Sequence, residues 1–308
     1  MADIVFIHGI NQELENASAL EAKWIAALVR ATRMAGVPAV ADRLEGKSGP
    51  AIVAKMAFYG NYFLTQNQQG ATEPIFQGEE REFAEALART WLQAAAERAT
   101  DPETRTSAKR ELFWLNEAVP GEQGVRSLSR SALAALASVP GFAHVGVAMA
   151  ERFVTRSIGQ MTAYFVDDDM HMNIQKTVAS CIKPETKVII AHSLGSVVAY
   201  EILHMLDKKM RLPLLVTLGS PLGLRNVIYD RLSPQPPRFP HGLAKWLNLS
   251  DPNDFVAAAP DLAQFFGENK PVDASFESWT TDNGSDAHEA VNYLGKTEVG
   301  AAVAAALG

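Results

Sequence analysis

The segment Ala-His-Ser-Leu-Gly at residues 191–195 places Ser193 in a position where its hydroxyl could act as a nucleophile. An apolar run, residues 187–191, leads into this segment, and an amphipathic run, residues 194–206, follows it directly. A serine on a sharp turn between a strand and a helix projects its hydroxyl outward, and the strained turn requires small neighbours. The N-terminus of the following helix adds partial positive charge where an oxyanion would develop. The segment therefore predicts acyl-transfer chemistry at Ser193.

The elements that must position Ser193 are predicted from the spacing of apolar residues. Six runs are typical of strands: residues 3–7, 51–59, 187–191, 214–218, 245–249 and 275–280. The third run is apolar on both faces, as expected of a buried parallel strand. Helical spacing is found in residues 16–35, 194–206 and 299–307. Strands that alternate with helices predict the α/β class with a doubly wound, mostly parallel sheet.

The block of residues 61–165 interrupts this alternation, since no strand pattern occurs in it. Residues 87–98 and 127–138 have the clearest helical spacing. One helical face must pack on a core, and its candidates include Phe83, Leu87, Trp91 and Phe113. We therefore predict a core domain formed by residues 1–60 and 166–308, and a helical cap inserted as residues 61–165.

The motifs of the predicted core resemble those of the α/β-hydrolase family, and in particular of bacterial lipase- and esterase-like members. In those proteins the first strand ends in His-Gly and the nucleophile turn is His-Ser-Leu-Gly. Here these are His8-Gly9 and residues 192–195, although Ala191 stands where the usual pattern has glycine. The resemblance covers residue 3 to about residue 60, and residue 186 to the C-terminus. It does not cover the insertion.

The resemblance implies an oxyanion hole and the order serine, acid, histidine along the chain. The two oxyanion N–H groups would come from Leu194, which follows the nucleophile, and from Ile10 in the loop after His8-Gly9. Glycine at position 9 lets the backbone approach closely. No cofactor and no metal are required by this chemistry. His8 itself is expected to be a packing residue.

Three histidines follow Ser193 and are candidates for the base: His204, His241 and His288. His204 lies about three helical turns beyond Ser193 and cannot reach back to it. His241 precedes the run 245–249 in a proline-rich loop, whereas His288 follows the last predicted strand in a turn-rich loop. The order and the place favour His288, with His241 as the alternative.

Two aspartates are candidates for the acid, because Asp251 and Asp254 both follow the run 245–249. Family members often have Asp-x-Val at the catalytic acid, and Asp254-Phe255-Val256 matches that pattern. Asp251 precedes a proline, and its side chain could instead organise the turn. We favour Asp254 and keep Asp251 as the alternate acid.

Other reactive side chains have simpler interpretations. Ser220 is followed by Pro221, with no long helix beginning there, so we expect a turn beside the pocket. Three adjacent acids, Asp167 to Asp169, cannot all face one metal ion and suit a helix N-terminus. Cys181 is the only cysteine of the chain, which excludes an intramolecular disulfide, and we expect it to be a buried core thiol.

The composition of the 308 residues narrows the class of protein. A formal charge of −7 argues against a nucleic-acid binder. There is no signal-peptide pattern and no apolar stretch long enough for a transmembrane helix, so we expect a cytoplasmic protein, with export lacking a cleaved signal as an open alternative. Protein partners are not indicated.

Together these features predict a serine hydrolase that cleaves carboxylic esters, with small-molecule or lipid esters as substrates. Peptidase, thioesterase or acyltransferase chemistry would use the same residues. A non-catalytic binding or effector-partner protein on the same scaffold is the alternative from another class.

Overall fold

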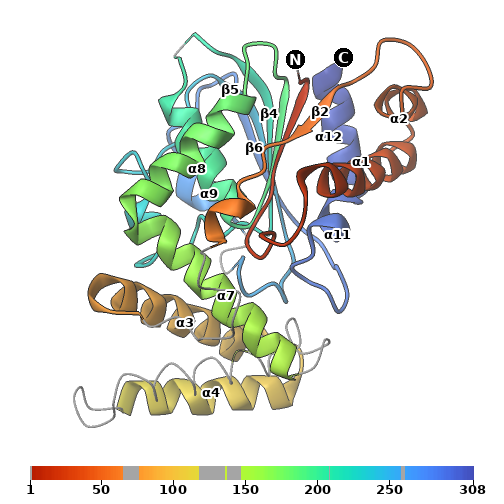
Figure 1. Ribbon diagram of the computed structural model, residues 1–308. Helices are drawn as coiled ribbons and strands as arrows, with labels where there is room; N and C mark the ends of the chain where they lie inside the picture. Colours follow the sequence, from red (N-terminus) through yellow and green to blue (C-terminus); the bar gives the residue numbers. More distant parts are fainter. Residues whose placement is uncertain (1, 65–75, 118–135, 137–146, 208, 258–260) are drawn as a thin grey trace.

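The computed structural model describes residues 2–64, 76–117, 136, 147–207, 209–257 and 261–308. In this part of the chain one six-stranded sheet has the order β2-β1-β3-β4-β5-β6 with every neighbouring pair parallel (Figure 1). The strands are β1 Ile4–Ile7, β2 Ala54–Met56, β3 Val188–His192, β4 Leu212–Leu218, β5 Leu243–Ser250 and β6 Ser275–Thr280. The predicted α/β class and parallel sheet are confirmed, and all six predicted runs contain a strand.

Helices flank the sheet, and alternate residues of each strand face different sides. On one side, Ile4 and Phe6 of β1 pack with α1 (Ala17–Met34) and α12 (Thr297–Leu307). On the other side, Val5 and Ile7 join the cluster that includes α8 (Asp168–Cys181) and α9 (Leu194–Met205). Every residue of the central strand β3 is buried, which explains its continuous apolar character. The shorter elements are α2 Pro38–Leu44, η1 Gly60–Phe63, η2 Tyr229–Arg231, α10 Ala263–Phe266 and α11 Ala290–Leu294.

The described part of residues 61–165 is helical and contains no strand. Its helices are α3 Gly78–Arg98, α4 Pro102–Glu117 and α7 Val147–Val166. Figure 1 shows α3 and α4 beyond one end of the sheet, and α7 running from beside α8 toward them. Phe83, Leu87 and Trp91 are buried as predicted. Phe113 is 57% exposed and is not part of the buried core. The predicted helix at residues 127–138 lies outside the described residues except for Leu136.

Two further expectations need correction. The second strand is limited to three residues, Ala54–Met56, because its partner β1 is short and ends before His8. Cys181 is half-buried rather than buried, because it is the last residue of α8 and its thiol lies at the border of the core. Among the described helices, none combines the length and the apolar character that crossing a membrane requires.

Candidate active site

Ser193 forms the turn between the end of β3 at His192 and the start of α9 at Leu194. Its φ angle is +51°, a left-handed conformation that is costly for any residue with a Cβ atom. The turn is held by the hydrogen bond from the Ser193 N–H to the Leu218 carbonyl, at 3.0 Å, and by the bond from the Ser196 N–H to the Ser193 carbonyl, at 2.9 Å. The structure thus has the sharp strand-to-helix turn that the sequence predicts.

Glycines at positions 9 and 195 allow the loop after β1, the turn at Ser193 and the start of α9 to lie close together. A Cβ atom on Gly9 would lie 2.7 Å from the Cβ atom of Ser193. A Cβ atom on Gly195 would overlap the carbonyl oxygen of His8, so α9 can begin against the end of β1 only with glycine at that position. The loop after β1 therefore lies directly beside Ser193, as the oxyanion-hole prediction for Ile10 requires.

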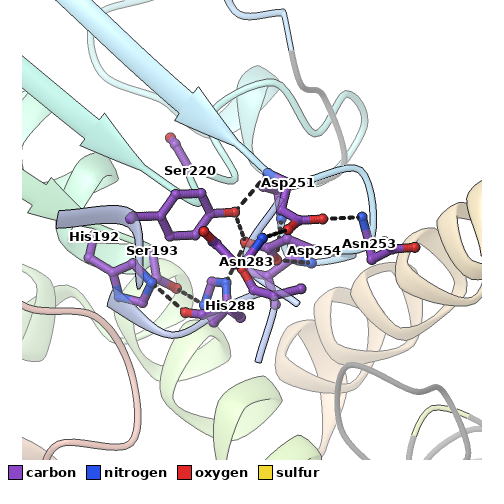
Figure 2. Close-up of polar contacts among 12 residues, drawn as sticks. His192, Ser193, Ser220, Asp251, Asn253, Asp254, Asn283 and His288 are labelled. Atoms are coloured by element: carbon purple, nitrogen blue, oxygen red, sulfur yellow. Dashed lines mark hydrogen bonds and ion pairs between the residues drawn. The ribbon is translucent and has the colours of Figure 1, made fainter. Parts of the chain in front are cut away.

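His288 links Ser193 to Asp254. Its Nε2 atom lies 3.0 Å from the Ser193 hydroxyl oxygen, and its Nδ1 atom lies 2.8 Å from Oδ2 of Asp254 (Figure 2). Asp254 follows β5 and His288 follows β6, so both loops lie at the carboxyl edge of the parallel sheet, where β3 also ends. When Nδ1–H donates to Asp254, Nε2 is left to accept the serine proton, which is the arrangement of a general base.

Asp254 is fully buried and each of its carboxylate oxygens has two donors. Oδ2 accepts from His288 and from the Tyr293 hydroxyl at 2.8 Å, and Oδ1 accepts the backbone N–H groups of Val256 and Ala257 at 3.1 and 3.2 Å. Burial by itself raises the pKa of Asp254, but the charge of His288 and these hydrogen bonds together lower it below its ordinary value. The carboxylate therefore stays ionised although it is buried.

Asp251 does not contact His288 through any described hydrogen bond, and instead organises the loops on either side of Asp254. Its Oδ1 accepts the Asn253 N–H at 2.8 Å, and its Oδ2 accepts the Asn283 N–H at 2.5 Å. Burial raises the pKa of Asp251. Asn283 lies in the loop that carries His288, so Asp251 ties the loop of Asp254 to the loop of His288 (Figure 2).

The loop that follows Ile10 is held by helix α7 of the insertion. The Asn11 N–H donates to Oε1 of Gln160 at 2.8 Å, and the Asn11 side-chain amide donates to the Ser157 hydroxyl at 2.7 Å. The Gln160 amide donates in turn to Glu13 at 2.8 Å. Asn11 has a φ of +60°, so the loop turns sharply just after Ile10. The candidate oxyanion loop and α7 are thus fixed to one another.

Two histidines are buried beside the site in neutral form. His8 donates from Nδ1 to the Gly9 carbonyl at 2.7 Å and accepts the Tyr59 N–H at Nε2 at 3.0 Å, a pairing that suits only one neutral tautomer. Burial lowers the pKa of His8 to about 4. His192 lies 2.8 Å from the His288 carbonyl through Nε2, and burial, with the nearby charge of His288, lowers its pKa to about 3. His192 therefore holds the backbone of the candidate base.

The other candidates from the sequence lie elsewhere. His241 is exposed, and His204 faces the Arg238 carbonyl at 3.3 Å. The Ser220 hydroxyl is buried at 2.6 Å from that of Ser196, which makes it part of the packing below the turn. Asp167 accepts the Met170 N–H and caps α8, and His171 pairs with Glu201 at 3.1 Å. Within the described residues, no group of three or more His, Cys, Asp or Glu side chains is placed to hold a metal ion.

Sequence reasoning missed three residues that contact the site: His192, Tyr293 and Arg98. His192 directly precedes Ser193 in the Ala-His-Ser-Leu-Gly segment, and this position is the signal that could have identified it as a residue of the site. Tyr293 is in α11, directly after the base loop, and only the hydrogen bond of its hydroxyl reveals its role. Arg98 comes from α3, far from the acid in sequence, and no local pattern indicates its contact with the acid loop.

Comparisons with protein-family models, with curated proteins and with solved structures found no match for this chain. The chemical interpretation therefore depends on the geometry around Ser193.

Proposed function

We propose that the chain is a serine hydrolase of the α/β-hydrolase fold that cleaves carboxylic esters. The observation that carries this proposal is the chain of hydrogen bonds from Ser193 through His288 to Asp254, at 3.0 and 2.8 Å, on a strained strand-to-helix turn. The parallel sheet, the order of the three residues along the chain and the close approach of Gly9 to Ser193 support it as well.

In the proposed reaction, His288 takes the hydroxyl proton of Ser193 while the oxygen attacks the acyl carbonyl. The backbone N–H groups of Leu194 and Ile10 stabilise the oxyanion. Collapse of the tetrahedral intermediate breaks the bond to the alcohol oxygen, which takes the proton from His288 and leaves an ester on Ser193. Water then repeats both steps, and Asp254 offsets the imidazolium charge throughout.

We further propose that residues 61–165 form a cap over this site and favour esters with an apolar acyl group. Helix α3 contacts the acid loop through Arg98, and α7 contacts the loop after Ile10. The buried side chains of α3 belong to the same apolar cluster as Leu194 and Phe255, which follow Ser193 and Asp254 in the chain, and as Ile10, which follows Gly9 in the loop beside Ser193. An apolar surround of this kind suits hydrocarbon chains, including those of lipids.

Labelling with a fluorophosphonate tests the proposal, because the reagent phosphonylates an activated serine and releases fluoride. We expect one adduct, located on Ser193 by peptide mass spectrometry. Ser193→Ala and heat-unfolded protein should stay unlabelled, while Ser220→Ala should label like the wild type. A folded wild-type chain that resists labelling and hydrolyses no p-nitrophenyl ester would favour a binding protein on the same scaffold.

A further inference from the structure

Arg98 is the last residue of α3, and its guanidinium contacts both ends of the turn formed by residues 254–257, which carries Asp254. Nη2 donates to the carbonyl of Asp254 and Nη1 donates to the carbonyl of Ala257, each at 3.3 Å. The same group lies 5.7 Å from the centre of the Phe255 ring. One side chain of the insertion therefore contacts the beginning, the middle and the end of residues 254–257.

This turn determines where the carboxylate points. The N–H groups of Val256 and Ala257 both donate to Oδ1 of Asp254, so the backbone of the turn holds one oxygen. The other oxygen, Oδ2, then faces Nδ1 of His288 at 2.8 Å. A rotation of the turn would swing both oxygens and lengthen the contact with His288. Any group that fixes the turn consequently fixes the orientation of the acid.

We propose that Arg98 is a positioning residue for Asp254, through which the helical insertion orients the acid of the triad. The inference rests on the proposed function, because that function makes Asp254 the partner of the base. Arg98 touches neither Ser193 nor His288 in any described contact, so it acts only through the turn. It gives the insertion a second role, in addition to covering the site.

The chemistry of the guanidinium suits this task. Its planar fork donates two hydrogen bonds in fixed directions, and so can hold two carbonyl oxygens in one relative position, which the single ammonium of lysine cannot. Burial lowers the pKa of Arg98, and the negative charge of Asp254 opposes that shift. The carboxylate of Asp254 therefore stabilises the charged form of the guanidinium. A guanidinium remains protonated in either case.

The insertion also offers a matched control. Arg105 of α4 donates from Nε and Nη2 to the carbonyl of Ala99, at 3.1 and 2.7 Å. This is likewise an arginine fork on a backbone carbonyl, and that carbonyl belongs to the residue directly after Arg98. The contact stays within the insertion and does not reach the acid loop. Loss of Arg105 removes a similar structural contact without freeing the turn at residues 254–257.

The test compares Arg98→Met, Arg98→Lys and Arg105→Met in the full-length protein, with hydrolysis of a p-nitrophenyl ester as the assay. We expect Arg98→Met to lower kcat by on the order of tenfold to a hundredfold, the range set by hydrogen bonds from a charged donor. KM should stay within about twofold of wild type, since substrate binding is not touched. Arg98→Lys should recover only part of the loss, and Arg105→Met should keep the wild-type kcat.

Proton NMR gives a readout that general loosening of the fold would not move. The Nδ1–H shared by His288 and Asp254 should give a low-field signal in the wild type and in Arg105→Met, and should move upfield or broaden in Arg98→Met. A wild-type kcat and a wild-type low-field signal in Arg98→Met would overturn the inference while fluorophosphonate labelling of Ser193 still supports the hydrolase. If Arg98→Met does not fold, the same two outcomes in Arg98→Lys decide the matter. Equal losses in the Arg98 and Arg105 variants would assign both residues to stability alone.

Discussion

The hydroxyl of Tyr293 lies 2.8 Å from Oδ2 of Asp254, the same carboxylate oxygen that faces the imidazole of the candidate base. The tyrosine oxygen also accepts the backbone N–H of Asp251 at 2.8 Å. Tyr293 is completely buried, so these two contacts hold its hydroxyl in place. One phenol therefore orients the carboxylate of Asp254 and anchors the start of the loop that carries it.

Tyr293→Phe should lower both activity and stability. The buried Asp251 N–H loses its acceptor, which costs about 1–3 kcal/mol in the free energy of unfolding. Asp254 loses one of the groups that orient it, and we expect kcat to fall by about tenfold. Tyr200→Phe is the control, because that hydroxyl is bonded to the Arg238 carbonyl, away from the triad, so its loss should change stability only. Urea unfolding and ester hydrolysis measure the two effects, and an unchanged kcat in Tyr293→Phe would remove Tyr293 from the site.

The two aspartates should respond differently to the same substitution. Asp254→Asn should lower kcat by on the order of 10⁴-fold, because the amide holds His288 in the wrong tautomer. Asp251→Asn weakens the link between the acid and base loops, so it should cost stability and lower kcat by less than about tenfold. Steady-state kinetics of both variants decide between them, and the opposite ranking would make Asp251 the acid.

Acid should destabilise the fold partly through His192. Its pKa in the folded chain is about 3, against 6.5 for an ordinary histidine. Because the folded value is the lower one, the neutral ring contributes stability that is fully present above pH 6.5 and declines as the pH falls toward 3. Between pH 6.5 and about 5 the loss should be on the order of 2 kcal/mol. His8, with a pKa of about 4, adds a loss of the same sign.

His192→Gln tests this contribution, since its amide can still donate to the His288 carbonyl but does not titrate. Urea unfolding at neutral and acidic pH should show a smaller acid loss in this variant than in the wild type. The same substitution at the exposed His241 is the control. Equal acid losses in wild type and His192→Gln would show that the ring is not held neutral.

The length of the acyl chain should affect the rate if the insertion provides an apolar surround. Each buried methylene contributes about 0.8 kcal/mol, or roughly fourfold in kcat/KM. A series of p-nitrophenyl esters from acetate to dodecanoate should therefore rise and then reach a plateau. A steady fall from acetate onward would rule out the apolar acyl site, and with it lipid-like substrates.

Local patterns were enough to predict the sheet and the strand-to-helix turn at Ser193. The strands of a parallel sheet are buried on both faces, so β3 and β4 are recognisable as apolar runs. The strained turn at Ser193 depends on its immediate neighbours and on the strand and helix that flank it. The location of His288 follows from the same logic, because parallel strands bring the loops after β3, β5 and β6 to one edge.

Contacts between distant segments were beyond such reasoning. Arg98 meets the loop of Asp254, and Gln160 meets the loop after Ile10, only because α3 and α7 lie beside the loops that follow β5 and β1. Neither residue differs in the sequence from an ordinary polar residue of a helix surface.

The most direct test of the central claim is the rate of ester hydrolysis by Ser193→Ala beside the wild type. Only a hydroxyl is removed, and the melting temperature should confirm that the variant folds. We predict that kcat falls by on the order of 10⁴-fold or more, leaving the residual rate that binding and the oxyanion hole supply. Hydrolysis at the wild-type rate by folded Ser193→Ala would contradict the assignment of Ser193 as the nucleophile.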